Sequence, residues 1–182
     1  KLTASHAQGT GGIKAVVRAG IDSIEHGFFL DDEAIDLMLE RGTYFVPTLA
    51  ALYFILLAGA DFGVPAFMLE KARRASEAQL ASFQRAWKAG VPIATGNDGG
   101  TPLNTSDNLA GELEQLVANG LTPAQALLAA TAVSSRLLRM EDQIGTVEAG
   151  KLADLVVLRA DPLKDISNVR EVELVIKEGQ IV

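Results

Sequence analysis

Residues 4–27 read ASHAQGTGGIKAVVRAGIDSIEHG and contain two short segments that each end near a histidine, His6 and His26. Between them, apolar residues recur at helical spacing from Ile13, after a glycine-rich turn, and Gly20 ends this helix. The stretch therefore predicts a strand, a helix and a second strand. This unit is typical of a parallel sheet with right-handed crossovers.

The same alternation continues for about two-thirds of the chain. Strands are predicted at 1–5, 21–25, 43–49 and 91–95, and helices at 31–41, 66–89, 108–118 and 122–140. The spacing suits a (β/α) barrel and a doubly wound sheet equally well. A doubly wound nucleotide fold would need a motif such as GxGxxG after a strand, and the glycines at 9–12 lack that register.

The pattern changes at about residue 143. Short strands are predicted at 144–147, 153–158 and 173–176, with turns between them and no helix. We therefore expect two parts, 1–142 and 143–182. The second is too short to bury a core of its own.

Composition excludes several classes of function. The chain has 182 residues and a formal net charge of −7, from 16 basic and 23 acidic side chains. Scattered basic residues argue against a nucleic-acid partner and against an anionic membrane surface. The longest apolar run, 49–60, is too short to span a bilayer. With no secretory leader pattern, we expect a cytoplasmic location.

The absence of cysteine restricts the chemistry of any metal site. Disulfides and thiolate zinc sites are excluded, so metal ligands must come from His, Asp or Glu. Both histidines of the chain, 20 residues apart, lie at the carboxyl ends of predicted neighbouring strands. Asp98 follows the strand at 91–95 in the same way, and Gly99 and Gly100 come after it. This is the edge of the sheet where barrel active sites form.

Two histidines and an aspartate suit a divalent metal in a hydrolase, with zinc as the first expectation. The metal lowers the pKa of a bound water, and a neighbouring carboxylate can take its proton and pass it to a leaving group. From spacing alone, hydrogen-bonded structural histidines and a turn-forming aspartate remain the alternative.

Three segments resemble one family. The stretch 4–27 is similar to the fifth and sixth strands of the metal-dependent amidohydrolase superfamily, nearest its imidazolonepropionase-like and Xaa-Pro dipeptidase-like branch. Residues 108–131 (NLAGELEQLVANGLTPAQALLAAT) resemble its last barrel helices. Residues 144–166 (IGTVEAGKLADLVVLRADPLKDI) resemble its return to a small β-sandwich domain. The likeness covers essentially the whole chain.

The resemblance implies an α/β fold: the C-terminal half of a TIM-like (β/α)8 barrel, strands five to eight, plus C-terminal strands of a small β-sandwich. It implies one or two divalent metals. His6 matches the ligand of the fifth strand, His26 that of the sixth, and Asp98 the ligand and proton shuttle of the eighth. The implied reaction is hydrolysis of a C–N bond in a dipeptide, a blocked amino acid or a cyclic amide.

This sequence departs from the family pattern at several positions. Asn97 stands where a threonine is usual, and residues 102–106 lack a histidine that contacts substrate in many relatives. The His-x-His of the first strand and the lysine of the fourth are absent. We therefore expect a fragment, or one chain of a two-chain assembly, completed by the missing N-terminal half or a second chain. Open sheet edges also favour an oligomer.

Weaker candidates flank the three expected ligands. Thr48 and Tyr44, on the predicted strand 43–49, and Asn97 are candidate substrate contacts, although a structural role is the stronger expectation for Thr48. The apolar segment 52–57 suits a wall or lid over substrate and a core or dimer helix equally well. Glu25 is expected to point away from the ligands, because strand neighbours face opposite ways.

Two other functions stay open at this point. One is a half barrel that dimerises through its strand edges and has no activity. The other is a lactone or phosphotriester hydrolase, because the same chemistry attacks those esters.

Overall fold

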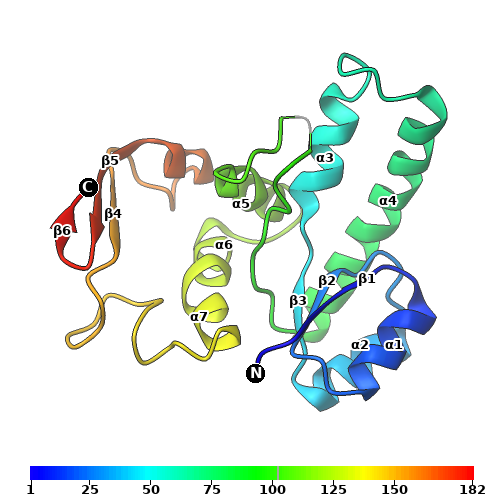
Figure 1. Ribbon diagram of the computed structural model, residues 1–182, viewed down its shortest axis with the longest axis horizontal. Helices are drawn as coiled ribbons and strands as arrows, with labels where there is room; N and C mark the ends of the chain where they lie inside the picture. Colours follow the sequence, from blue (N-terminus) through cyan, green and yellow to red (C-terminus); the bar gives the residue numbers. More distant parts are fainter. Residues whose placement is uncertain (102) are drawn as a thin grey trace.

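The computed structural model describes residues 1–101 and 103–182, and it has an α/β fold with two sheets in that part of the chain (Figure 1). The first sheet is parallel, in the order β1 (Ala4–Ala7), β2 (Ser23–His26) and β3 (Tyr44–Val46). The second is antiparallel, in the order β4 (Leu155–Leu158), β5 (Val172–Lys177) and β6 (Gln180–Ile181).

Helices separate the strands of the first sheet and connect it to the second. They are α1 (Thr10–Arg18), α2 (Asp32–Arg41), α3 (Leu49–Ala58), α4 (Ala66–Ala89), α5 (Leu109–Ala118), α6 (Pro123–Leu128), the π-helix η1 (Ala129–Val133), α7 (Ser134–Leu137) and the 3₁₀-helix η2 (Ile166–Arg170). In the described part of the chain, none is long and apolar enough to cross a bilayer.

The predicted bounds of α4 are confirmed, and its ends show why. The helix starts directly after Pro65, whose fixed φ favours a helix start, and it ends at Gly90 with φ +95. The capping box predicted at Thr122 is also present, because its hydroxyl accepts from the Gln125 amide while the Gln125 side chain accepts from the Thr122 amide.

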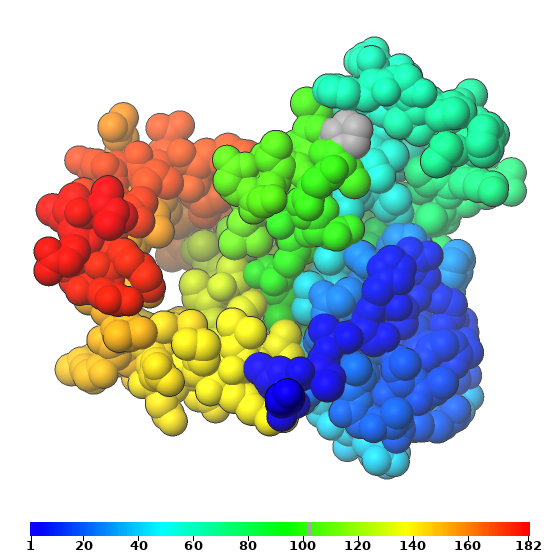
Figure 2. Space-filling model, viewed as in Figure 1, coloured from blue at the N-terminus to red at the C-terminus, as the bar shows by residue number. Residues whose placement is uncertain are grey.

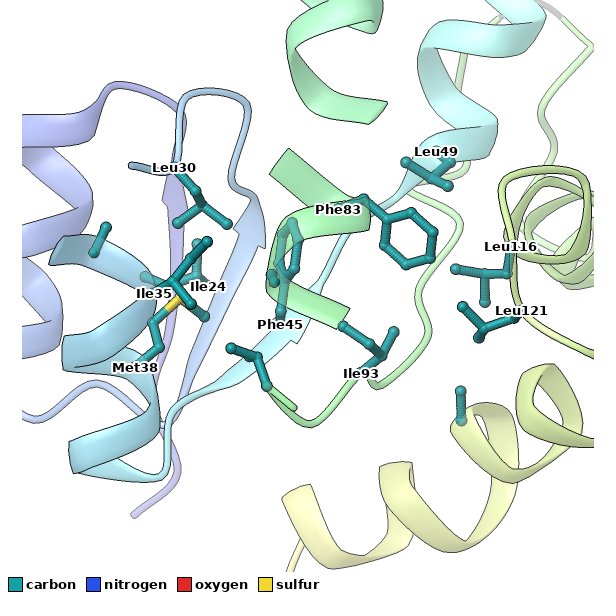
Figure 3. Close-up of a cluster of buried hydrophobic side chains, with 14 of the residues drawn as sticks. Ile24, Leu30, Ile35, Met38, Phe45, Leu49, Phe83, Ile93, Leu116 and Leu121 are labelled. Atoms are coloured by element: carbon teal, nitrogen blue, oxygen red, sulfur yellow. The ribbon is translucent and has the colours of Figure 1, made fainter. Parts of the chain in front are cut away.

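The main core lies on one face of the parallel sheet. Ile24 of β2 and Phe45 of β3 are fully buried against the helices, and Phe45 lies near Phe83 of α4 and Ile93 (Figure 3). Each such side chain contributes roughly 1.5–3 kcal/mol through burial. These contacts fix which way the strands face.

The register of the sheet then defines its other face. Paired residues of parallel strands point the same way, and Ile24 pairs with Phe45 in the core row. In the next row, His6 pairs with Glu25 and Glu25 with Val46. These three residues therefore point to the opposite side, which we call the histidine face.

Two strand predictions are wrong. Residues 91–95 form only a single parallel bridge, between Ile93 and Phe45, because Pro92 lacks an amide donor. Its carbonyl still accepts from the Phe45 amide at 2.9 Å. Residues 144–146 form a bend in which Gly145 has φ +95, and residue 147 belongs to no strand. The helix η2 lies between β4 and β5, where the pattern predicts none.

The helix predicted at 122–140 is continuous from Pro123 to Leu137, where it ends three residues early, and it is irregular. It runs through α6, η1 and α7, and its π-helical turn brings Ser134 toward the end of the preceding bridge segment. The Ser134 hydroxyl donates to the Ala129 carbonyl at 2.7 Å and accepts from the Thr95 amide at 3.3 Å. This hydroxyl thus ties the helix to the segment that leads to Asp98.

The second sheet lies beside α5. In Figure 2, its orange and red residues form a lobe next to the green residues of that helix. Arg170 of η2 makes a two-pronged ion pair with Glu114 of α5, at 2.7 and 3.0 Å. A largely apolar cavity of about 710 Å³ lies between α5, η1 and this sheet.

Candidate metal centre at the carboxyl ends of the parallel strands

The two histidines lie side by side. Their ring centroids are 4.4 Å apart with an interplanar angle of 70°. His6 lies on the histidine face, whereas simple alternation would send His26 to the helix side, because it pairs with Ala7 of the core. A φ of +71 at His26, uncommon for a residue with a side chain, ends the alternation and lets the rings meet.

Thr48 holds the ring of His26. The Nδ1 atom of His26 lies 2.7 Å from the Thr48 hydroxyl in a buried hydrogen bond. Burial lowers the pKa of His26, the neighbouring His6 lowers it further, and Asp98 opposes both effects. The neutral imidazole that results, with Nδ1 engaged, leaves Nε2 as the nitrogen for a ligand bond.

His6 is more exposed than His26, and its Nε2 lies 3.2 Å from the side-chain nitrogen of Gln8. In the tautomer of His6 that carries its proton on Nδ1, the lone pair of Nε2 accepts from this amide NH2 group. A lone pair at that atom is also what a metal ligand requires.

Asp98 lies in a loop that is fixed by asparagines. Asn104, fully buried, donates to the carbonyls of Asn97 at 2.6 Å and Asp98 at 3.2 Å, and the Asn97 side chain donates to the Thr105 carbonyl. Asp98 itself has φ +50. It is close enough to influence the pKa of His26, yet within residues 1–101 and 103–182 no cluster of three potential ligands forms.

Glu25 points to a different side of the sheet from the one that strand alternation predicts. It shares the histidine face with His6, so the prediction that it points away from the expected ligands is wrong. Burial raises the pKa of Glu25, and the charge of Asp98 raises it further, whereas a hydrogen bond from Ser23 lowers it. The prediction failed because the positive φ at His26 changes the side to which His26 points, while Glu25 keeps the side that its strand register gives it.

The three candidate substrate contacts lie in different places. Thr48 is 3% exposed, follows β3 and contacts His26. Tyr44 begins β3 and pairs with Ser23, at the strand end opposite to Thr48. Asn97 uses its side chain within its own loop. A substrate role for any of the three stays a prediction.

Three buried polar side chains from two helices hold the backbone around this centre. Glu112 of α5 accepts from the first amides of α3, and Gln79 of α4 donates to the Pro47 carbonyl. Ser82 of α4 donates to the Phe28 carbonyl, just after β2. Pattern reasoning missed all three residues.

A signal for them exists in the sequence. The buried positions of α4 are 79, 82, 83 and 86, the spacing of one helix face, and those of α5 include 112, 113 and 116. Gln79, Ser82 and Glu112 thus occupy positions where an apolar residue is the rule. Their partner atoms lie 32 to 63 residues away along the chain, beyond the reach of a periodicity argument.

The donor set fits part of the shell of a divalent cation. Two imidazoles meet at adjacent strand ends, and a carboxylate lies near them, which is the ligand chemistry of zinc and similar ions. His6, His26 and Asp98 are the residues of the described chain that could hold such an ion.

Comparisons with known proteins identify the family of this chain. The model of the amidohydrolase family matches residues 1–182. Ochratoxinase of Aspergillus niger is 31% identical over 172 residues, which cover 94% of this chain and 35% of that protein. Imidazolonepropionase of Geobacillus thermodenitrificans is 30% identical over 187 residues, which cover 100% of this chain and 39% of that protein.

A solved structure gives the same result in three dimensions. The crystal structure of a Xaa-Pro dipeptidase with bound methionine in its active site aligns with a TM-score of 0.90 and 39% identity, over 100% of this chain and 44% of that one. The chain thus spans less than half the length of these relatives. The resemblance inferred from the motifs is confirmed: the chain belongs to the amidohydrolase family.

Proposed function

We propose that this chain supplies the C-terminal part of a metal-dependent hydrolase that cleaves an amide or peptide-like C–N bond. In this proposal, residues 1–142 provide strands five to eight of a barrel, the eighth being the segment 91–95 that bridges β3, and 143–182 provide strands of a small accompanying domain. The remaining strands come from an N-terminal half or a second chain. The family match and the names of the similar hydrolases support the reaction class.

The residues of this chain have distinct roles in the proposal. His6 and His26 hold a divalent ion, zinc in the first place, together with Asp98. When bound, such an ion polarises the scissile carbonyl and acidifies a water molecule. Thr48 keeps the His26 ring in its orientation, and Asp98 accepts the proton of the water and delivers it to the leaving nitrogen.

The single observation that carries the proposal is the meeting of the two histidine rings, 4.4 Å apart, at the ends of adjacent parallel strands. Burial favours the neutral, ligating form of His26, and its φ of +71 turns it from the core row toward His6. A histidine held in that backbone conformation beside a second histidine supports a functional role.

The test is metal content and hydrolysis measured on the complete protein that carries this chain. We expect about one or two zinc equivalents per protein, and loss of both metal and activity in His6→Asn and His26→Asn. Gln143→Ala, an exposed polar change remote from the centre, is the control. A substrate panel should include Xaa-Pro dipeptides, N-acyl amino acids, a lactone and a phosphotriester.

The panel also separates the alternatives. Turnover of the esters but not the amides would replace the C–N assignment with a lactone or phosphotriester hydrolase. A folded, metal-free dimer without any turnover would refute the proposal and identify an inactive assembly.

A further inference from the structure

Glu112 is a charged side chain at the centre of the fold. Its exposed fraction is 0%, and it lies one turn before Leu116, which is equally buried, on the core-facing side of α5. Buried carboxylates are rare and need hydrogen-bond partners. The partners of Glu112 therefore indicate what the residue is for.

Both carboxylate oxygens bind the start of α3. Oε1 accepts from the Leu49 amide at 3.1 Å, and Oε2 accepts from the Ala50 amide at 2.7 Å. The first amides of a helix have no partner within the helix, and its positive end favours a negative charge. Glu112 thus takes the place of an N-cap, although it lies more than 60 residues further along the chain.

This arrangement leaves Thr48 available for another contact. Thr48 is the residue before α3, where a threonine hydroxyl normally caps the helix. Within the described part of the chain it makes no such cap, and its hydroxyl bonds Nδ1 of His26 at 2.7 Å instead. Glu112 satisfies the helix amides, so the threonine hydroxyl is free to orient the histidine.

The turn that carries Thr48 also needs support. Thr48 has φ +53, a conformation that is unfavourable for a β-branched residue and persists only where its surroundings impose it. Glu112 fixes the two amides after Thr48, and Gln79 donates to the carbonyl of Pro47 before it. The turn is therefore held on both sides by side chains from different helices.

We propose that Glu112 is a positioning residue: by binding the first amides of α3, it holds the Thr48 hydroxyl on His26 and so orients that ring for its ligand. The functional part of this inference rests on the proposed function, in which His26 binds the metal. The structural part, control of the contact between Thr48 and His26, does not.

The test is a double-mutant cycle with Glu112→Gln and Thr48→Val in the complete, metal-loaded protein. Glu112→Gln keeps the volume and one acceptor oxygen, but it places an NH2 group against a backbone amide. We expect each single variant to lower kcat/KM and to raise the zinc dissociation rate by about tenfold. Because both act through one contact, the double variant should be no worse than about the poorer single variant.

Leu116→Ala is the matched control, because it removes buried volume from the same helix without touching the α3 amides. It should lower stability yet leave kcat/KM within about twofold, which separates positioning from general destabilisation. If the effects of the two substitutions on kcat/KM multiply in the double variant, the proposal is overturned. Wild-type kcat/KM and zinc retention in Glu112→Gln would overturn it as well.

A crystal structure of Glu112→Gln separates the failure of this inference from the failure of the proposed function. We expect the hydrogen bond between Thr48 and His26 to be lost or lengthened beyond hydrogen-bond range. If it survives unchanged, the positioning role is refuted whether or not the protein is a hydrolase. If it is lost in a protein that binds no metal, the positioning role stands and only the proposed function fails.

Discussion

Substitution of Glu112 by glutamine should change how stability depends on pH. Burial raises the pKa of this carboxyl from 4.5 to about 7, and the amides of Ala50 and Leu49 offset only part of the effect. At about 1.4 kcal/mol for each pH unit, this difference corresponds to about 3 kcal/mol. No other described carboxyl is both fully buried and bound to the start of a helix.

The direction of the change follows from proton binding. Between pH 4.5 and about 7, the folded protein holds a proton on Glu112 that the unfolded chain has released. This contribution to stability is complete below pH 4.5 and is lost as the pH rises through about 7. Glu112→Gln has no such proton. As the pH rises from 4.5 to 8, the free energy of unfolding of the wild type should therefore fall by about 3 kcal/mol relative to that of the variant.

The assay is urea-induced unfolding of both proteins at half-unit steps from pH 4.5 to 8, with stability taken as a difference at each pH. Taking the difference removes the contributions of other groups, such as Glu25, whose pKa is also raised. Isotope-edited infrared spectra of the carboxyl band would follow the proton directly. A difference between wild type and variant that stays constant across this range would refute the assignment of a raised pKa to the buried Glu112.

Two glycines give further predictions. Gly145 and Gly150 share φ +95, but a Cβ at Gly145 would lie 2.6 Å from Cβ of Ser135, whereas among the described residues no atom lies within 4 Å of one at Gly150. Alanine should thus cost about 1 kcal/mol at Gly150 and about 3 kcal/mol at Gly145 in chemical denaturation, and equal losses would contradict this packing. At Gly99, a Cβ would lie 2.6 Å from Cα of Ser106 in the loop of the expected aspartate ligand. Gly99→Ala should lower the free energy of unfolding by about 1–3 kcal/mol and should lower the rate of hydrolysis. An active variant of wild-type stability would show that the loop adjusts to the added Cβ and would contradict this prediction.

Local signals account for much of the fold. The bounds of α4 follow from Pro65 and Gly90, and the start of α6 from the Thr122 capping box, because proline, glycine and capping residues act within one turn of the chain. The sequence predicts a strand at 91–95, where the structure has a single bridge at Ile93. β-Branched residues indicate an extended backbone, but they do not indicate how many hydrogen-bonded pairs it forms with a neighbouring strand.

The site was predictable only to the level of strand ends. The positions of His6 and His26 after short strands indicated neighbouring rings, and the structure brings them together. The route differs from the expected one, because a positive φ at His26 overrides strand alternation. The same alternation rule, applied to Glu25, gave the wrong face.

The supporting residues lay beyond pattern reasoning for a physical reason. Glu112 and Gln79 interrupt apolar helix faces, which marks them as unusual. What each one binds depends on backbone amides and carbonyls that carry no sequence information. Only the tertiary arrangement identifies the start of α3 and the carbonyl of Pro47 as their partners.

The π-helical turn Ala129–Val133 has a consequence for how the chain can vary over evolutionary time. A π-turn corresponds to one inserted residue in an α-helix, and removing it would rotate everything that follows by about 100°. Ser134 would then leave the Thr95 amide. The buried Ala129 and Ala132 restrict which side chains fit here, and a single-residue deletion would change the facing of every later position in the helix. Descendants of this gene should therefore preserve the length of this segment more strictly than the identities of its amino acids.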